Sequence, residues 1–396
     1  MTSRVRRRLL QALAAAPIVA RAPAFAAPSD PNRLLVLVFL YGGNDNFNTW
    51  VPFTDPLYYR LRPTIAIARD AVIPVTERHG FNRALAPLMP MWEAHELALV
   101  QGIGYPGATQ QHYRDIEMAF TACDADEFYR DGWVTRALVS SRTRAQASND
   151  PGSNLDAIAF ETLDIHESDP MGPFRGDKLG VVQVHYADEL LAKRRLADCV
   201  IDANTRGREL AQRTKSFAAV ELKTAFPSDP FGQAIRATVE IASVDRSVPV
   251  IHIALNGLDG DKHHSVDCHW DQAKFHGDAL KRLAEGLVAL RAGLREIGRW
   301  DETLVATYDE FGRSPVENPE HGTHHGHSSV HFVMGGRVKG GLIGEAPPVE
   351  RVHFVGGPAP VIDPRRLWTS VVEGWWNGDA SRLFARRYKA LDLLRA

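Results

Sequence analysis

The sequence lacks the features that mark several classes of protein. Its 396 residues contain three cysteines, Cys123, Cys199 and Cys268, an odd number at irregular spacings that provides no disulfide framework. We therefore expect free or buried thiols. Acids and bases are interspersed and nearly balanced, with a formal net charge of −2. The chain thus has neither the basic patch of a nucleic-acid partner nor a polybasic membrane surface.

The sequence also lacks an apolar run long enough to span a membrane, which needs about 20 apolar residues. The N-terminal run Leu9–Ala20 is shorter than that. We expect no membrane span in the mature chain. A basic start before this run and the small-residue motif Ala24-Phe25-Ala26 are typical of a cleaved export signal. Arg6-Arg7, followed by Leu9-Leu10, favours a twin-arginine signal over residues 1–26, and an ordinary secretory signal is the alternative. We expect the twin-arginine translocase as export partner and a periplasmic or secreted location.

Buried-strand patterns alternate with helical ones along the rest of the chain. Leu34 to Tyr41 is a continuous apolar run that ends in Gly42-Gly43, as expected of a central parallel strand. The expected strands cover 34–41, 97–103, 248–255, 303–308 and 329–334; the expected helices cover 82–99, 272–297, 366–376 and 381–394, with another that starts near Thr109 or Gln110. Residues 140–180 are expected to form a loop. The pattern predicts one α/β domain over 27–396, with a mostly parallel central sheet, helices on both faces and a helical insertion over about 186–245.

Histidine is the abundant residue type that needs an explanation. Most of the sixteen histidines crowd two segments: His263, His264, His269 and His276, and then His321, His324, His325, His327 and His331. Clustered imidazoles with carboxylates nearby suit a transition-metal site, and a solvated loop is the alternative for either cluster alone.

Four polar groups are expected to follow strands. They are Asp45, Asp267 with His269, Asp309 with Glu310, and His324 with His325. Strand ends converge at one edge of an open α/β sheet, so these residues can meet around one centre. Oxygen and imidazole ligands together favour a divalent metal such as zinc, manganese or iron over calcium, with zinc or manganese expected. The alternatives are that Asp45 caps a helix and that Glu310 pairs with Arg313.

Several segments, in order along the chain, resemble signatures of the domain-of-unknown-function family fifteen-oh-one, whose exported members often carry twin-arginine signals. These segments are Phe39-Leu40-Tyr41-Gly42-Gly43-Asn44-Asp45-Asn46-Phe47-Asn48-Thr49, Asp267-Cys268-His269-Trp270-Asp271-Gln272, Asp309-Glu310-Phe311-Gly312-Arg313-Ser314-Pro315, Gly322-Thr323-His324-His325-Gly326, Val338-Lys339-Gly340-Gly341 and Asp363-Pro364-Arg365-Arg366-Leu367.

The resemblance implies an alkaline phosphatase/sulfatase-like fold with one or two metals at the strand ends. The metal-binding residues that it implies are Asp45, Asp267, His269, Glu310 and His325. Residues 259–266 look like an insertion that carries rival ligands, Asp259, Asp261, His263 and His264. The family's Arg-Ser-His segment here reads Gln110-Gln111-His112.

Taken together, these features predict an exported metal-dependent hydrolase of phosphate or sulfate esters, small or polymeric. Thr109 or a metal-bound water is the expected nucleophile, and an ordinary helix cap is the alternative for Thr109. Arg313 or His327 is expected near the departing charge. His112 is a ligand, a partner behind a ligand, or a packing residue. The alternative function is an exported metal-binding or scaffold protein with a degenerate, non-catalytic site, which the absence of the Arg-Ser pair favours.

Overall fold

A computed structural model of the chain describes residues 33–145, 155–160, 172–184, 186–203, 205–213, 219–255, 266–349 and 356–395. The export signal expected over 1–26 lies outside these residues, as do Asp259, Asp261, His263 and His264. Within the described ranges, no helix is both long and apolar enough to cross a membrane. Cys123, Cys199 and Cys268 are all buried, as predicted.

The described residues build a nine-stranded central sheet in the order β14-β5-β13-β10-β1-β9-β6-β7-β8. Its strands are β1 (Leu34–Leu40), β5 (Leu97–Ile103), β6 (Ala157–Phe160), β7 (Val181–Val184), β8 (Val200–Ala203), β9 (Val250–Leu255), β10 (Thr303–Tyr308), β13 (Ser329–Met334) and β14 (Gly341–Ile343). Neighbouring strands from β10 through β1, β9 and β6 to β7 run parallel, and β14 is parallel to β5. β13 is antiparallel to β10 and β5, and β8 to β7. The predicted α/β class with a mostly parallel sheet is confirmed.

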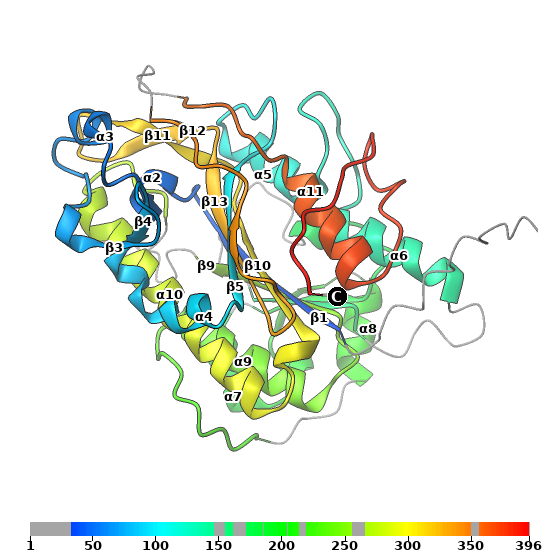
Figure 1. Cartoon of the computed structure of the whole chain (residues 1–396). Helices are drawn as coiled ribbons and strands as arrows, with labels where there is room; N and C mark the ends of the chain where they lie inside the picture. The colour runs from blue at the N-terminus through cyan, green and yellow to red at the C-terminus, as the bar shows by residue number, and fades with distance from the viewer. Residues whose placement is uncertain are drawn as a thin grey trace, which may run out of the picture.

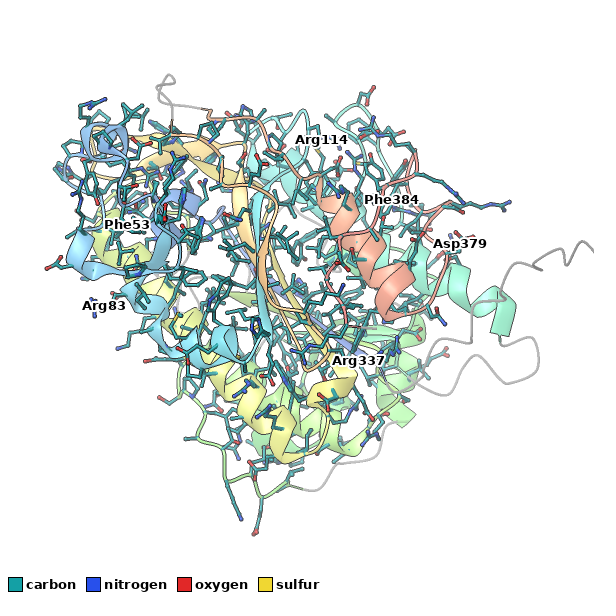
Figure 2. The ribbon with its side chains drawn as sticks, viewed as in Figure 1. Phe53, Arg83, Arg114, Arg337, Asp379 and Phe384 are labelled. Atoms are coloured by element: carbon teal, nitrogen blue, oxygen red, sulfur yellow. The ribbon has the colours of Figure 1, made fainter. Side chains whose placement is uncertain are left out.

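Alternate residues of β1 face two separate cores. All seven residues of β1 are buried. Leu34, Val36, Val38 and Leu40 pack in one apolar cluster with α9 (Pro230–Val244) and α10 (Gln272–Glu296). Leu35, Leu37 and Phe39 pack in the other cluster with α5 (His112–Thr121), α6 (Trp133–Ala145) and α11 (Pro364–Thr369). Figure 1 shows these helix groups on opposite faces of the sheet, and Figure 2 shows side chains filling both layers.

Smaller elements flank the edge at which β1 ends. β11 (Gly312–Glu317) and β12 (Thr323–Gly326) form a two-stranded antiparallel sheet, and β2 (Trp50–Val51), β4 (Gly80–Asn82) and β3 (Val72–Pro74) form a three-stranded one. The remaining elements are short: α2 (Asn46–Thr49), α3 (Pro56–Leu61), α4 (Met89–Glu93), α7 (Ala187–Lys193), α8 (Thr205–Arg213), the 3₁₀ turns Arg69–Ala71, Arg83–Leu88, Gly172–Phe174, Leu196–Asp198 and Trp300–Glu302, and the π-helix Ser370–Trp375 that continues α11.

Some predicted elements were wrong. Over 82–99, a 3₁₀ turn and the short α4 replace the expected helix, because Pro87 and Pro90 remove backbone donors. Residues 381–394 are not helical, although apolar side chains such as Leu383 and Leu393 are buried. The expected loop over 140–180 includes β6, and the expected helical insertion over 186–245 includes β8, which extends the central sheet.

Candidate metal centre

One edge of the central sheet collects most of the polar segments predicted from the sequence. β1, β9 and β10 run parallel and end there, and the antiparallel β13 begins there. β5, antiparallel to β13, ends at the same edge, and α5 follows it. His324 and His325 reach the edge differently from the prediction, since they lie within β12 rather than after a strand of the central sheet.

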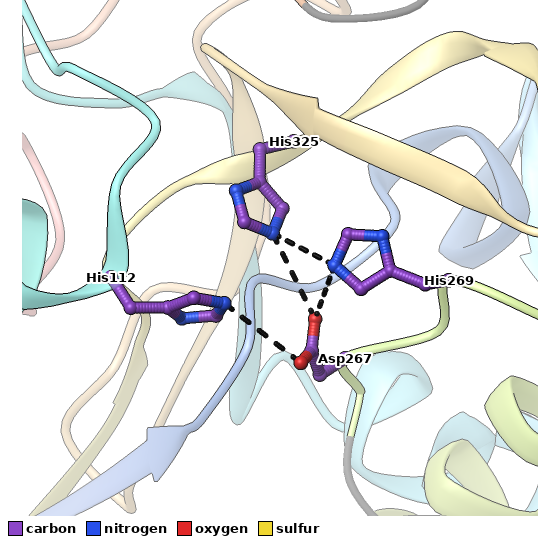
Figure 3. A group of neighbouring side chains, drawn as sticks. All are labelled: His112, Asp267, His269 and His325. Atoms are coloured by element: carbon purple, nitrogen blue, oxygen red, sulfur yellow. Dashed lines mark hydrogen bonds and ion pairs between the residues drawn. The ribbon is translucent and has the colours of Figure 1, made fainter.

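Four side chains converge at this edge: His112 from the start of α5, Asp267 and His269 from the segment before α10, and His325 from β12 (Figure 3). Each offers one ligand atom, and these atoms all lie within 4.8 Å of one another. His269 Nε2 is 3.0 Å from His325 Nε2 and 3.1 Å from Asp267 Oδ1. His112 Nε2 is 3.8 Å from Asp267 Oδ2, and His325 Nε2 is 3.9 Å from Asp267 Oδ1. The sequence left the role of His112 open, and the structure places it among the convergent groups.

His325 is held in one tautomer by a backbone carbonyl. Its Nδ1 lies 2.7 Å from the oxygen of Gln110, which can only accept a hydrogen bond, so Nδ1 carries the proton and donates. The ring stacks on Phe311 at 4.1 Å between centroids. Burial, reinforced by the nearby Arg313, lowers the pKa of His325 to about 3. The neutral ring therefore presents the lone pair of Nε2 to the cluster.

His112 is held in the same way by a carboxylate. Its Nδ1 is 3.0 Å from Glu310 Oε1, which also accepts a hydrogen bond from the backbone NH of Gly42 at 2.8 Å. Burial alone would lower the pKa of His112, but the hydrogen bond and charge of Glu310 raise it. The ring of Tyr41 stacks on the imidazole at 5.5 Å. Glu310 thus lies behind His112, outside the group of convergent ligand atoms.

Asp267 is oriented by Arg313, whose guanidinium is fully buried. The guanidinium donates to Asp267 Oδ1 and Gly42 O, to Gly43 O at 3.1 Å and to Thr323 O at 3.0 Å. Burial alone would raise the pKa of Asp267, but the charge of Arg313 and the neighbouring histidines hold it well below its usual range. Asp267 is therefore an ionised carboxylate. Arg313 therefore orients Asp267. The predicted contact between Arg313 and a leaving group stays a prediction.

A turn before α5 supplies the carbonyl that orients His325. Asp115 Oδ1 accepts hydrogen bonds from the backbone NH and the hydroxyl of Thr109, at 2.8 and 2.9 Å, and Asp115 Oδ2 accepts from the NH of Gln110 at 2.6 Å. Gln110 has a φ of 62°, and its carbonyl oxygen accepts a hydrogen bond from His325 Nδ1. Thr109 is not the cap of α5, which begins after Gln111. The sequence feature that could have identified Asp115 as part of this turn is its place as an acidic residue in the first turn of the expected helix.

Asp45 and Glu310 are the two predicted ligands that the structure does not bring into the group. Asp45 caps α2 through the NH of Phe47 and pairs with the buried Arg62. The capping alternative drawn from the sequence is thus what the structure shows for Asp45. Asp309, beside Glu310, accepts hydrogen bonds from Asn44 and Ser329.

The donor set fits a zinc-like ion. Zinc bonds of about 2.0–2.2 Å in a tetrahedral arrangement separate neighbouring ligand atoms by about 3.3–3.6 Å. Four of the pairs are 3.0, 3.1, 3.8 and 3.9 Å apart, on either side of that range, and all the ligand atoms lie within 4.8 Å of one another. Three imidazoles and one carboxylate are also ligands that zinc and manganese accept.

Comparison with solved structures finds likeness at low identity. The C-terminal periplasmic domain of EcEptC from Escherichia coli, a complex with Zn, is 9% identical, with a TM-score of 0.41, and the match covers 78% of this chain and 74% of that one. The phosphonate monoester hydrolase SpPMH from Silicibacter pomeroyi is 10% identical, with a TM-score of 0.41 and coverage of 88% and 73%. The sulfatase PsFucS1 from Pseudoalteromonas sp. is 10% identical, with a TM-score of 0.39 and coverage of 87% and 68%. At these scores the likeness does not extend to an activity.

No curated protein gives a match to the chain. The sequence model of a family described as "Protein of unknown function (DUF1501)" matches residues 202–355, a segment that contains Asp267, His269, Arg313 and His325. The match agrees with the resemblance that the motifs indicated.

Proposed function

We propose that this protein is a metal-dependent hydrolase of phosphate or sulfate esters, with one divalent ion, zinc or manganese, bound by His112, Asp267, His269 and His325. The observation that carries the proposal is the convergence of three imidazole Nε2 atoms and one ionised carboxylate at the carboxyl edge of the sheet. The choice of phosphate or sulfate esters as the substrate class rests on the resemblance to the family.

The residues behind the ligands support metal binding rather than a chance cluster. Glu310 and the Gln110 carbonyl fix two histidines with Nδ1 protonated, and Arg313 fixes Asp267. Such partners behind the ligands orient metal sites in general. When bound, a divalent ion polarises an ester oxygen and acidifies a coordinated hydroxyl or water.

Thr109 is the proposed nucleophile. Its hydroxyl donates to Asp115 Oδ1 at 2.9 Å, which is the nucleophile–base arrangement that activates a hydroxyl. Burial raises the pKa of Asp115 and thereby strengthens it as a proton acceptor. In this proposal Asp115 takes the hydroxyl proton as Thr109 Oγ1 bonds to the phosphorus or sulfur of the ester. The bond from that atom to the alcohol oxygen breaks, and the alcohol leaves with the proton that Asp115 took. Water then hydrolyses the phospho- or sulfo-threonine and restores Thr109.

The second candidate is a metal-binding protein without catalysis. The Thr109–Asp115 bond also favours this reading, because the same hydroxyl stabilises the turn that presents Gln110 to His325. With a purely structural Thr109, a water acidified by the ion would be the remaining nucleophile.

Metal content and ester cleavage together separate the two candidates. We would load purified protein with zinc or manganese, measure bound metal by elemental analysis, and assay an aryl phosphate and an aryl sulfate. Asp267→Ala and His325→Ala should remove the metal and lower the rate by about 100-fold or more. His321→Ala is the matched control, because His321 is an exposed histidine that pairs with Glu317 outside the cluster.

Three results decide the matter. Bound metal with ester cleavage supports the hydrolase; loss of that cleavage in Thr109→Ala assigns the nucleophile to Thr109, and its retention assigns it to a metal-bound water. Stoichiometric metal without cleavage of any ester supports the non-catalytic protein. Absence of bound metal in the wild-type protein contradicts both.

We also propose a periplasmic or secreted location, reached through the twin-arginine translocase. The support is the sequence of residues 1–26. Replacing Arg6 and Arg7 with lysine should leave uncleaved precursor in the cytoplasm. Normal export of that variant would instead indicate the ordinary secretory route.

A further inference from the structure

Arg62, which follows α3, occupies a cage of oxygen atoms beside the proposed centre. Its guanidinium is fully buried and has five N–H groups, each with its own acceptor. Nη1 donates to Asp45 Oδ2 at 2.5 Å and to Asn48 Oδ1 at 2.8 Å. Nη2 donates to Asp45 Oδ1 at 3.0 Å and to Ser314 O at 2.6 Å, and Nε donates to Pro315 O at 3.0 Å. The guanidinium is thus completely satisfied by protein oxygens.

Asp45 is equally saturated from its own side. A carboxylate offers about four lone-pair sites. Those of Asp45 receive the two Arg62 bonds, the backbone NH of Phe47 at 3.0 Å, and the side-chain amide of Gln272. The Asp45 side chain is 1% exposed, whereas that of Asp267 is 25% exposed. Asp45 therefore has no acceptor position left for a metal ion.

The chemistry of the cage is that of a cation site. Carboxylate, side-chain amide and backbone carbonyl oxygens are the ligands that hard cations take from proteins. Burial alone would raise the pKa of Asp45, but the charge of Arg62 lowers it, so the pair is ionised and its charges cancel. A divalent ion entering the same cage would meet a buried positive charge that cannot be deprotonated.

We infer that Arg62 is the resident cation of Asp45, so that the described residues hold one metal ion, at the four convergent groups, and no second ion at Asp45. The inference rests on the proposed metal-binding function and fixes its stoichiometry. It assigns Asp45 a structural ion pair in place of the ligand role predicted from the sequence.

Metal stoichiometry and thermal stability test the inference together. We would strip the protein with a chelator, titrate it with zinc and with manganese, and count bound ions by elemental analysis. Wild type should bind one equivalent, Asp45→Asn should bind one with unchanged affinity, and Asp267→Asn should lose it. In chelator, Asp45→Asn should lower the Tm by on the order of 5 °C, because Arg62 keeps a buried charge without its counter-ion.

Asp55→Asn is the matched control. Asp55 caps α3 as Asp45 caps α2, through an NH two residues on, but it has no buried arginine partner among the described contacts. Asparagine caps helices as well as aspartate does, so this variant should match the wild type in Tm and in metal content.

The outcomes separate the inference from the function on which it rests. Two equivalents in the wild type, or metal affinity weakened tenfold or more in Asp45→Asn, overturn the inference and leave the metal centre standing. No bound metal in the wild type overturns both. If Asp45→Asn does not fold, the wild-type stoichiometry alone decides between one ion and two.

Discussion

Glu310 Oε1 and His112 Nδ1 lie 3.0 Å apart at the edge of the central sheet, although 198 residues separate them in the sequence. The other oxygen of Glu310 is buried without a hydrogen-bond partner among the described residues. Burial raises the pKa of this carboxyl group. Glu310, which the motif suggests as a metal ligand, thus contacts the ligand atoms only through His112. Its contribution to metal affinity can therefore be measured by substitution.

Glu310→Ala should weaken metal binding by about 10- to 100-fold, because His112 loses the acceptor that fixes its tautomer and ring orientation. Competition against a chelating dye measures the change. Glu317→Ala is the control, since Glu317 contacts His321 at 3.2 Å in a carboxylate–histidine pair outside the cluster. Equal affinity in the Glu310 and Glu317 variants would show that Glu310 does not position His112.

Asp115→Ala should also weaken metal binding, by about tenfold, through a longer chain of contacts. Without its carboxylate the turn at Thr109 and Gln110 loses three hydrogen bonds, and the Gln110 carbonyl no longer holds His325. The same titration measures the loss. A variant that kept wild-type affinity would mean that the turn holds its shape unaided.

Gly42→Ala should unfold the edge at which the site is built. Gly42 has a φ of +100°, and a Cβ there would lie 2.2 Å from the Cβ of Asp267. Strain and overpacking together should cost about 2–4 kcal/mol in the free energy of unfolding, measured by denaturant titration. Gly277→Ala in α10, where a Cβ meets nothing within 4 Å, should instead stabilise the protein by up to about 1 kcal/mol. Equal effects of the two substitutions would contradict this account of the turn.

His276 should make stability fall in acid. Burial lowers the pKa of His276 from 6.5 to about 4; the charge of Asp45 opposes this shift, and the charges of Arg62 and Arg313 add to it. The Nε2 of His276 lies 3.0 Å from Asn44 Oδ1. As the pH falls from 6.5 toward 4, the unfolded chain takes up a proton that the folded chain refuses, so about 3 kcal/mol of stability is lost over that interval.

His276→Gln keeps a donor toward Asn44 but does not titrate. The variant should therefore lose less stability than the wild type over the same pH interval, as denaturant midpoints at several pH values would show. Parallel pH profiles for the two proteins would contradict the prediction.

The central strands and α10 were predictable because their patterns are strong. Leu34 to Leu40 is a continuous apolar run, and α10 repeats leucines such as Leu280 and Leu287 on its buried face. The helix predicted over 381–394 was wrong because the spacing of apolar residues there does not reflect a helix. Leu383 and Leu393 are buried, but the backbone around them is irregular.

The candidate site was predictable in part. The motifs identified Asp267, His269 and His325, which the structure brings together. Asp45 could not be separated from them by sequence, because its partner Arg62 lies on a different element and carries no motif. His112 was ambiguous for a similar reason, since the acceptor that fixes its ring comes from the end of another strand.

The four convergent groups span the chain from His112 to His325 and come from three separate segments. No fragment that ends before β12 holds them all, so the ligand set exists only once the sheet is assembled. A precursor threaded through a membrane as an unfolded chain would cross without the ion. For the metal and the export route proposed above, an ion acquired in the cytoplasm would require a chain that folds there first, so the compartment that supplies the ion would depend on the route.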